Sequence, residues 1–374
     1  MKGKIFWLYF LFLFMTTIVS AEEVANKGQT SYSLYVDTYY TKTNNKYPSN
    51  QRSYTTQAVN VEAFSLNFAL AQFSYDSKDF RANLGLHTGT YVEFNYAAEP
   101  QLAKNIYEAY GGYRITKGLW LDVGIFASHI GMENAISRDN YNYTRSLMAE
   151  NSPYYESGAK LSYKPNEKLS LTLLLLNGWQ VIQDNNRDKS WGTQITYQFS
   201  KKFTLNWSTY VGNDAPDTER RRMRYFSHIS AVMKLTQKLE AMAAYDIGHE
   251  KKPYYSPYDR WSNNDYNLLR KTSDNGYYNW SGWSLLLRYS LNQKWRLGTR
   301  LESYLDKSQV IVKTDTTNGF QIYGGSVNID FQPLDNLLFR LEAKAMHSLD
   351  SVYPNKNQYN RDDRLVVASM SFWF

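Results

Sequence analysis

The sequence contains no cysteine, and proline is scarce, at 9 of 374 residues. The lack of cysteine excludes disulfides and a lipid anchor on an N-terminal cysteine, and it removes the thiolates that most structural zinc sites use. An excess of one charge is also lacking, because 42 basic and 35 acidic side chains leave a dispersed net charge of +7. This balance does not indicate nucleic-acid binding. Few prolines and many aromatic residues argue against a disordered chain.

Long hydrophobic runs are missing beyond the N-terminus. After the first apolar stretch no run of 18 or more apolar residues occurs, so the chain has no candidate transmembrane helix. At the start, Lys2 and Lys4 precede the apolar stretch 5–19, which ends in small residues around Ser20 that fit a cleavage site. These features predict a secretory signal peptide at residues 1–21 and hence an exported protein.

Tyrosine, by contrast, is abundant, with 33 tyrosines beside 10 tryptophans. Both residue types are enriched in β-strands and at membrane interfaces. From residue 31 onward, segments of about ten residues alternate apolar with polar side chains, which is the period of a strand with one apolar face. Clear examples lie at 80–87, 119–126, 295–302 and 337–344. No stretch of useful length has a helical period, so the chain is predicted to be all-β.

The connections between these segments alternate between short turns and longer polar loops. The short turns are expected at 76–79, 116–118, 164–167, 200–202, 236–238, 292–294 and 332–335, and the long loops at 41–60, 95–104, 131–154, 179–190, 213–222, 250–279, 306–320 and 348–362. An even number of strands with short turns at one rim and long loops at the other is typical of bacterial outer-membrane barrels. We predict a transmembrane antiparallel up-and-down β-barrel of about 16 strands at 31–374, after a short N-terminal segment at 22–30. Both termini are then expected on the periplasmic side.

Charged residues fall almost entirely on the polar phase of the strands. If the apolar face contacts lipid, that polar phase lines a lumen, and about sixteen strands are too many for side chains to fill it. Acids on this phase are Glu108, Asp122, Glu240, Asp246 and Asp330. The predicted pore-lining and selectivity residues are Arg81, Arg114, Lys160, Arg288, Arg296, Arg300, Arg340, Lys344, Glu302 and Glu342.

Several segments resemble a known family. They are Tyr141-Asn142-Tyr143-Thr144-Arg145-Ser146, the stretch from Ser152 to Tyr163, Leu176-Asn177-Gly178-Trp179, and Arg340-Leu341-Glu342. Together they resemble the OmpL-like β-barrel porins of the porin-2 type, over essentially the whole mature chain. The resemblance implies a channel-like function in the bacterial outer membrane and names no solute. Similarity to outer-membrane barrels also implies that the last strand, ending at Phe374, is read by the barrel-assembly machinery.

Similarity to sixteen-stranded porins further implies that the third long loop, 131–154, folds into the lumen as a constriction. Its charged residues, and thus the candidate constriction residues, are Glu133, Arg138, Asp139, Arg145 and Glu150. In a ring of sixteen strands, Arg296 and Arg300 would face the root of this loop across the pore. The resulting transverse field would filter ions, so that neutralising both arginines shifts selectivity toward cations. The alternative is that these arginines simply pair with Glu302 and Glu342 along the wall.

The function predicted from the sequence is passive diffusion of small hydrophilic solutes or ions, without cofactor, metal or catalytic residue. The expected partners are outer-membrane lipid and lipopolysaccharide, the solutes and the assembly machinery, whereas nucleic acid is not expected and a homo-oligomer is left open. One alternative is a non-conducting barrel that serves as adhesin, receptor or structural protein, with the 250–279 loop as a binding platform or plug. Another is an outer-membrane lipid hydrolase, since His228-Ile229-Ser230 places a histidine and a serine on one strand face.

Overall fold

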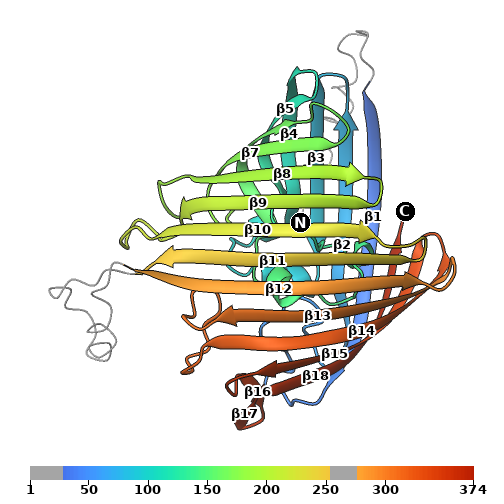
Figure 1. Ribbon diagram of the computed structural model, residues 1–374, viewed down its shortest axis with the longest axis vertical. Coiled ribbons are helices and arrows are strands. Elements are labelled where there is room, and N and C mark those ends of the chain that lie inside the picture. Colours follow the sequence, from blue (N-terminus) through green and yellow to red (C-terminus); the bar gives the residue numbers. More distant parts are fainter. Residues whose placement is uncertain (1–27, 253–275) are drawn as a thin grey trace, which may run out of the picture.

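Sixteen antiparallel strands form a closed barrel in the computed structural model, which describes residues 28–252 and 276–374 (Figure 1). The barrel strands are β1 (Gln29–Thr43), β2 (Phe64–Asp76), β3 (Phe80–Thr88), β4 (Ile106–Thr116), β5 (Leu119–Ala127), β6 (Tyr155–Tyr163), β7 (Leu169–Leu176), β8 (Ser190–Ser200), β9 (Phe203–Asn213), β10 (Met223–Lys234), β11 (Leu239–Lys251), β12 (Tyr277–Ser290), β13 (Trp295–Asp306), β14 (Phe320–Leu334), β15 (Leu337–Ser348) and β18 (Asp362–Trp373). Each strand pairs with its neighbour along the chain, and β1 pairs with β18 to close the ring. Closure pairs the backbone groups that an open sheet edge would expose to lipid.

The predicted fold class and strand number are confirmed. The seven short turns and eight long connections occur between the strands where the alternation placed them. In Figure 1 the long connections of the front wall lie at the left and the short turns at the right. The predicted signal peptide and the central part of the 250–279 loop lie outside the described residues. A small hairpin, β16 (Tyr353–Asn355) and β17 (Gln358–Asn360), lies within the last long connection.

The two faces of the barrel wall differ in chemistry. Large apolar side chains such as Leu84, Val123 and Leu301 are exposed on the outer face, whereas the alternate positions carry buried polar residues such as Asp122 and Glu302. Because successive side chains of a strand point to opposite faces, the sequence alternation produces this division directly. An apolar outer face and a polar inner face are what a barrel in lipid requires.

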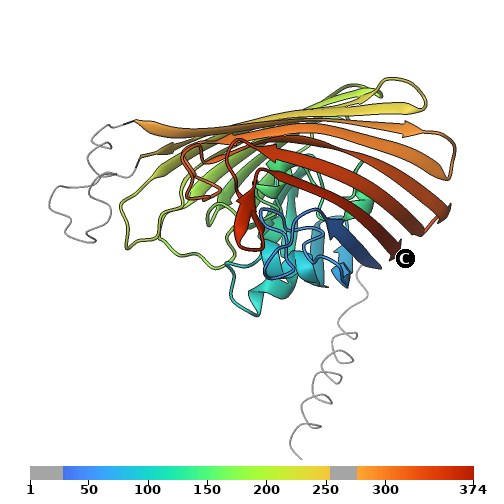
Figure 2. The same ribbon diagram turned by 90° about the horizontal axis from the view of Figure 1, so that it is seen from below.

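The helical segments are short and belong to the long connections. They are α2 (Thr90–Asn95), α3 (Leu147–Glu150) and the 3₁₀ turns η2 (Ala103–Asn105) and η3 (Ser137–Asp139). In the described part of the chain, no helix has the length and apolarity that a membrane crossing needs. The α3 turn lies between the barrel walls, behind β12 in Figure 1 and beneath the upper wall in Figure 2.

An apolar cluster forms where connections fold into the barrel. Leu147 and Met148 of α3 pack against inward side chains of β12, β13 and β14, among them Trp280, Tyr304 and Phe320. The half of the barrel that bears the long connections therefore contains packed side chains as well as charged groups. This packing positions the third long connection, which is the candidate functional element.

Candidate channel constriction

Residues 131–154, which we call the inner loop, join β5 to β6 and run inside the barrel. Tyr143, Arg145 and Ser146 have an exposed fraction of 0%. A loop buried to this degree must find partners for its backbone N–H and C=O groups, because unpaired buried groups are costly. The strands β13 and β15 supply several of them.

Two wall carboxylates accept hydrogen bonds from the backbone of the inner loop. The Thr144 N–H donates to Glu342 Oε2 at 2.7 Å, and the Thr144 hydroxyl donates to Oε1 of the same carboxylate at 2.8 Å. One turn later the Leu147 N–H donates to Glu302 Oε2 at 2.5 Å. Glu302 and Glu342, predicted as pore-lining residues, thus bind the loop.

Three wall cations donate to carbonyl oxygens of the same loop. Arg300 donates to the Thr144 carbonyl at 2.5 Å, and Lys344 donates to the Arg145 carbonyl at 3.1 Å. Arg340 reaches the carbonyls of Ser137, at 2.5 Å, and Asn140, at 2.7 Å. Charged hydrogen bonds of this kind are among the stronger ones in proteins.

The position of Arg300 differs from the sequence-based expectation of an arginine facing the loop across open water. The loop crosses the lumen and reaches the opposite wall, so that Arg300 touches it directly and is buried. Arg300 also lies 3.0 Å from Glu302 and 3.5 Å from Glu342. The pairing along the wall that was left open as an alternative is therefore present, together with the contact to the loop.

Two glycines on the inner face allow the loop to come this close. A Cβ added at Gly298 of β13 would lie 2.4 Å from the Tyr141 carbonyl oxygen, and one at Gly282 of β12 would lie 2.7 Å from Met148 Cγ. Distances this short are sterically forbidden, and the first involves rigid backbone. Gly298 is therefore part of the docking surface for the inner loop.

The charged residues within the inner loop divide into two groups. Glu133 accepts hydrogen bonds from the Ser146 N–H and lies 3.7 Å from Arg300. Burial raises the pKa of Glu133, and the Arg300 charge offsets this only in part. Arg138 and Asp139 pair at 3.4 Å and remain partly exposed.

A second buried charge of the loop, Arg145, stacks on two tyrosines. Its guanidinium lies 4.5 Å from the ring centre of Tyr91 and 4.2 Å from that of Tyr154, and 3.7 Å from Glu150. Glu150 in turn accepts hydrogen bonds from the Thr56 N–H and hydroxyl at 2.8 and 2.7 Å. The first and second long connections are thereby tied to the inner loop.

A second set of predicted residues lies on the wall outside the loop contacts, and here the cations are more exposed than their acids. Arg81 is 29% exposed beside a fully buried Asp122, which also lies 3.8 Å from Lys160. Arg296 is 25% exposed beside Asp330, which is 1% exposed. In these two pairs the cation is more exposed than its acid, whereas Arg288 and Arg114 are less exposed than their partners Glu240 and Asp79.

The remaining predicted pore-lining arginines lie nearer the short-turn rim or over the loop. Arg114 pairs with Asp79 at 2.6 Å beside the β2–β3 turn. Arg288 pairs with Glu240 at 2.5 Å, and its guanidinium lies 4.2 Å from the ring centre of Tyr141 in the inner loop. Arg288 is thus brought to the surface of the loop, whereas Arg114 is not.

Sequence reasoning missed the anchor at the start of the third connection. His129 Nδ1 lies 2.8 Å from Glu156 Oε1, and its Nε2 lies 2.8 Å from the Thr209 carbonyl oxygen. Burial disfavours the imidazolium, but the Glu156 carboxylate outweighs this effect and raises the pKa of His129. The partners are 27 and 80 residues away, so no local motif could have indicated them.

The structure also shows where the histidine and serine considered for lipid hydrolysis lie. His228 and Ser230 are buried on the inner face, while Ile229 between them is exposed on the outer face. His228 Nδ1 lies 2.5 Å from Asp246 Oδ1. Within residues 28–252 and 276–374, no group of three or more histidine, cysteine or acidic side chains is arranged to hold a metal ion.

A closed, lipid-facing β-barrel with a loop docked in its lumen is a protein of the porin class. The family model described as "Putative beta-barrel porin-2, OmpL-like" matches residues 29–374, so the chain belongs to this family. It is a channel barrel of the bacterial outer membrane, as the resemblance in the sequence implied. No curated protein matches the sequence.

Solved porin structures share the fold. An anion-selective porin from Comamonas acidovorans superposes with a TM-score of 0.60 at 7% identity, covering 93% of this chain and 100% of that one. The channel DcaP of Acinetobacter baumannii gives a TM-score of 0.55 at 10% identity, with coverages of 94% and 99%. OmpF of Salmonella typhi, solved with daunomycin, gives 0.56 at 11% identity, with coverages of 92% and 97%. Identities this low show a common fold alone.

Proposed function

We propose that this porin passes small hydrophilic anions preferentially, through a lumen narrowed by the inner loop. The observation that carries the proposal is the unequal exposure of paired charges on the inner wall, where Arg81 and Arg296 face the interior and their carboxylates are buried. A partly exposed cation on a low-dielectric wall attracts anions and repels cations in the adjacent water. The net charge of the wall need not be large for this effect.

The contacts between the inner loop and the barrel wall support a fixed constriction rather than a mobile gate. The inner loop is held by Glu302, Glu342, Arg300, Arg340 and Lys344, which all belong to the rigid sheet. Elements with many buried contacts and paired backbone groups open rarely, whereas mobile lids have few of either. The predicted constriction role of residues 131–154 is therefore retained as part of the proposal.

The experiment is a reversal-potential measurement in a planar bilayer across a potassium chloride gradient. The wild-type channel is expected to show anion preference, and the double variant Arg81→Gln/Arg296→Gln is expected to move the reversal potential toward cation preference. A charge-matched control, Lys201→Gln/Lys202→Gln, removes two cations from the β8–β9 turn outside the lumen. Cation preference in the wild type, or equal shifts in variant and control, would contradict the proposal.

Arg300 is assigned a different role from Arg296. Its guanidinium is buried and bound to the loop and to Glu302, so its charge is neutralised locally. We expect Arg300→Gln to alter conductance through a displaced loop more than it alters ion selectivity. The sequence predicted that neutralising Arg296 and Arg300 together shifts ion selectivity. We now expect the shift in selectivity from Arg296 and the change in conductance from Arg300.

We further propose that the barrel performs no chemistry on lipid. A lipid hydrolase of the barrel type needs its histidine and serine on the lipid-facing surface. His228 and Ser230 lie on the inner face, and the imidazole of His228 is buried against Asp246. Phospholipid hydrolysis by the refolded protein above the rate of a His228→Asn variant would contradict this assignment.

We also propose that the barrel-assembly machinery recognises the last strand. β18 closes the barrel against β1, and Phe372 and Phe374 are exposed at its end. Truncation of Phe374 is expected to reduce the amount of folded barrel in the outer membrane without changing refolding in detergent.

A further inference from the structure

An apolar groove crosses the outer surface of the barrel where β13, β14, β15, β18 and β1 meet. Its volume is about 890 Å³. Small side chains form the floor, because Gly325 of β14 pairs with Ala345 of β15, and Ala343 follows on the same face of β15. Leu301 and Val366 rise on either side and are exposed.

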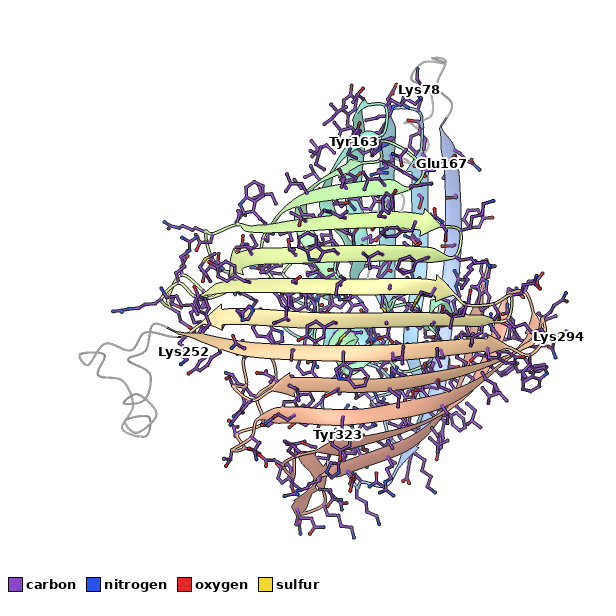
Figure 3. All side chains as sticks on the ribbon, in the orientation of Figure 1. Lys78, Tyr163, Glu167, Lys252, Lys294 and Tyr323 are labelled. Carbon is purple, nitrogen blue, oxygen red and sulfur yellow. The ribbon has the colours of Figure 1, made fainter. Side chains whose placement is uncertain are left out.

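The groove results from the strand register. Leu301 pairs across with Gly325, and Val366 pairs with Ala343, so large side chains stand directly beside small ones. On β14 the large outer residue Tyr323, labelled in Figure 3, precedes Gly325 by two positions. The apolar outer face is thus interrupted by a furrow floored by small side chains.

Two cations lie at the end of this groove nearest the long connections. Lys42 of β1 pairs across with Val366, and Arg364 of β18 pairs with Ala345. Among the described residues neither side chain has an ion-pair partner. The acid nearest to them on the same face of β18, Asp362, lies 2.9 Å from His347 Nδ1. Unpaired cations on an outer face are unfavourable in hydrocarbon and favourable beside anionic headgroups.

A polar pocket of about 510 Å³ adjoins the groove on the side of the long connections and shares Asn44 with it. Its lining adds two exposed lysines, Lys46 and Lys356, whose backbones are joined by a 2.7 Å hydrogen bond. Amide side chains complete it, namely Asn44, Asn355, Asn357 and Gln358. Groove and pocket therefore form a continuous surface that changes from apolar to cationic to polar.

We propose that this surface binds one phosphorylated, multiply acylated glycolipid of the outer leaflet, of the lipid A class. An acyl chain lies in the groove over Gly325, Ala343 and Ala345. Phosphate groups contact Lys42 and Arg364, and the sugar headgroup lies in the pocket beside Lys46. The order of chemistries along the surface matches the order in such a lipid from the bilayer core outward, and the long-connection rim is the side on which the outer leaflet lies.

The test is native mass spectrometry of the refolded mature chain in neutral detergent, titrated with hexa-acylated, bis-phosphorylated lipid A. One lipid is expected to stay bound to the wild type, and phosphatidylcholine is expected to bind at least about 10-fold more weakly. The variant Lys42→Gln/Arg364→Gln is expected to lose roughly 10- to 30-fold in affinity for lipid A. Ala343→Leu/Ala345→Leu, which fills the groove from the lipid side, is expected to lose a similar factor.

The control is Lys238→Gln/Lys294→Gln, which removes two exposed cations from the short-turn rim. Figure 3 labels Lys294 at that rim. This variant is expected to bind lipid A like the wild type. Equal affinity of all variants, or equal binding of lipid A and phosphatidylcholine, would overturn the proposal. A wild-type oligomer that Ala343→Leu/Ala345→Leu converts to monomers without affecting lipid binding would also overturn it, because the groove would then be an interface between copies.

Discussion

At the scale of single residues, charged side chains inside this barrel bind the backbone of the inner loop. Glu342 accepts both the N–H and the hydroxyl of Thr144, and Arg300 binds the Thr144 carbonyl. One loop residue thus has all its polar groups bound by two charged residues from the wall. A charge in a wide lumen can therefore replace the water that a buried loop backbone has lost.

This role predicts a stability effect for Glu342→Ala. The change leaves two donors of Thr144 unpaired in a buried site and removes one carboxylate partner of Arg300. Removal of one member of a buried pair costs about 3–5 kcal/mol. Equilibrium urea unfolding of the barrel in lipid vesicles measures the difference. Lys294→Ala, at an exposed turn, serves as the control and is expected to stay within about 0.5 kcal/mol. A loss below about 1 kcal/mol for Glu342→Ala would show that the carboxylate is dispensable for docking.

His129 provides a prediction in pH. Its pKa is raised in the folded protein, so its pairing with Glu156 stabilises the fold fully below about pH 6.5. That contribution is lost as the pH rises through the folded-state pKa. NMR titration of histidine-labelled protein is expected to show His129 titrating above about 6.5, with the resonance assigned by His129→Gln. In Glu156→Gln the same resonance is expected to titrate at lower pH, and an unchanged midpoint would contradict the account.

At the scale of elements, strands were predictable and the path of the inner loop was not. The period-two alternation at 295–302 is local, so it predicts a strand and its outer face without knowledge of the rest of the chain. The docking of Tyr141 over Gly298 joins positions that lie far apart in the sequence, and no short-range pattern encodes that approach. Similarity to other porins implied the inward fold, whereas the choice of wall residues emerged only from the structure.

Gly298 tests the docking of the loop directly. A methyl group from Gly298→Ala would lie 2.4 Å from the Tyr141 carbonyl oxygen, so the loop is expected to shift away from β13. We expect the single-channel conductance to change, or its noise to increase, by a measurable factor. Gly111→Ala is the matched control, because a Cβ there meets only Phe80 at 3.8 Å. Equal conductance traces for both variants would argue that the loop does not border the path of the ions.

At the scale of the whole molecule, the sequence predicted the barrel and its polarity, but not which inner charges face water. Arg296 and Arg300 occupy the same face of β13, yet the first is partly exposed beside Asp330 and the second is buried beneath the loop. Alternation assigns both to the inside and cannot distinguish them, because burial depends on a connection from elsewhere in the chain. The proposed anion preference is consequently a property of the assembled lumen.

The central claim is that this barrel is an open porin whose lumen is narrowed by the inner loop. Single-channel conductance of the refolded mature protein in a planar bilayer tests it most directly, compared with a variant in which a Gly-Ser linker replaces residues 134–150. Discrete steps are expected for the wild type, with larger steps for the variant. A wild type that inserts as a folded barrel and remains silent, or two proteins with the same conductance, would contradict the account.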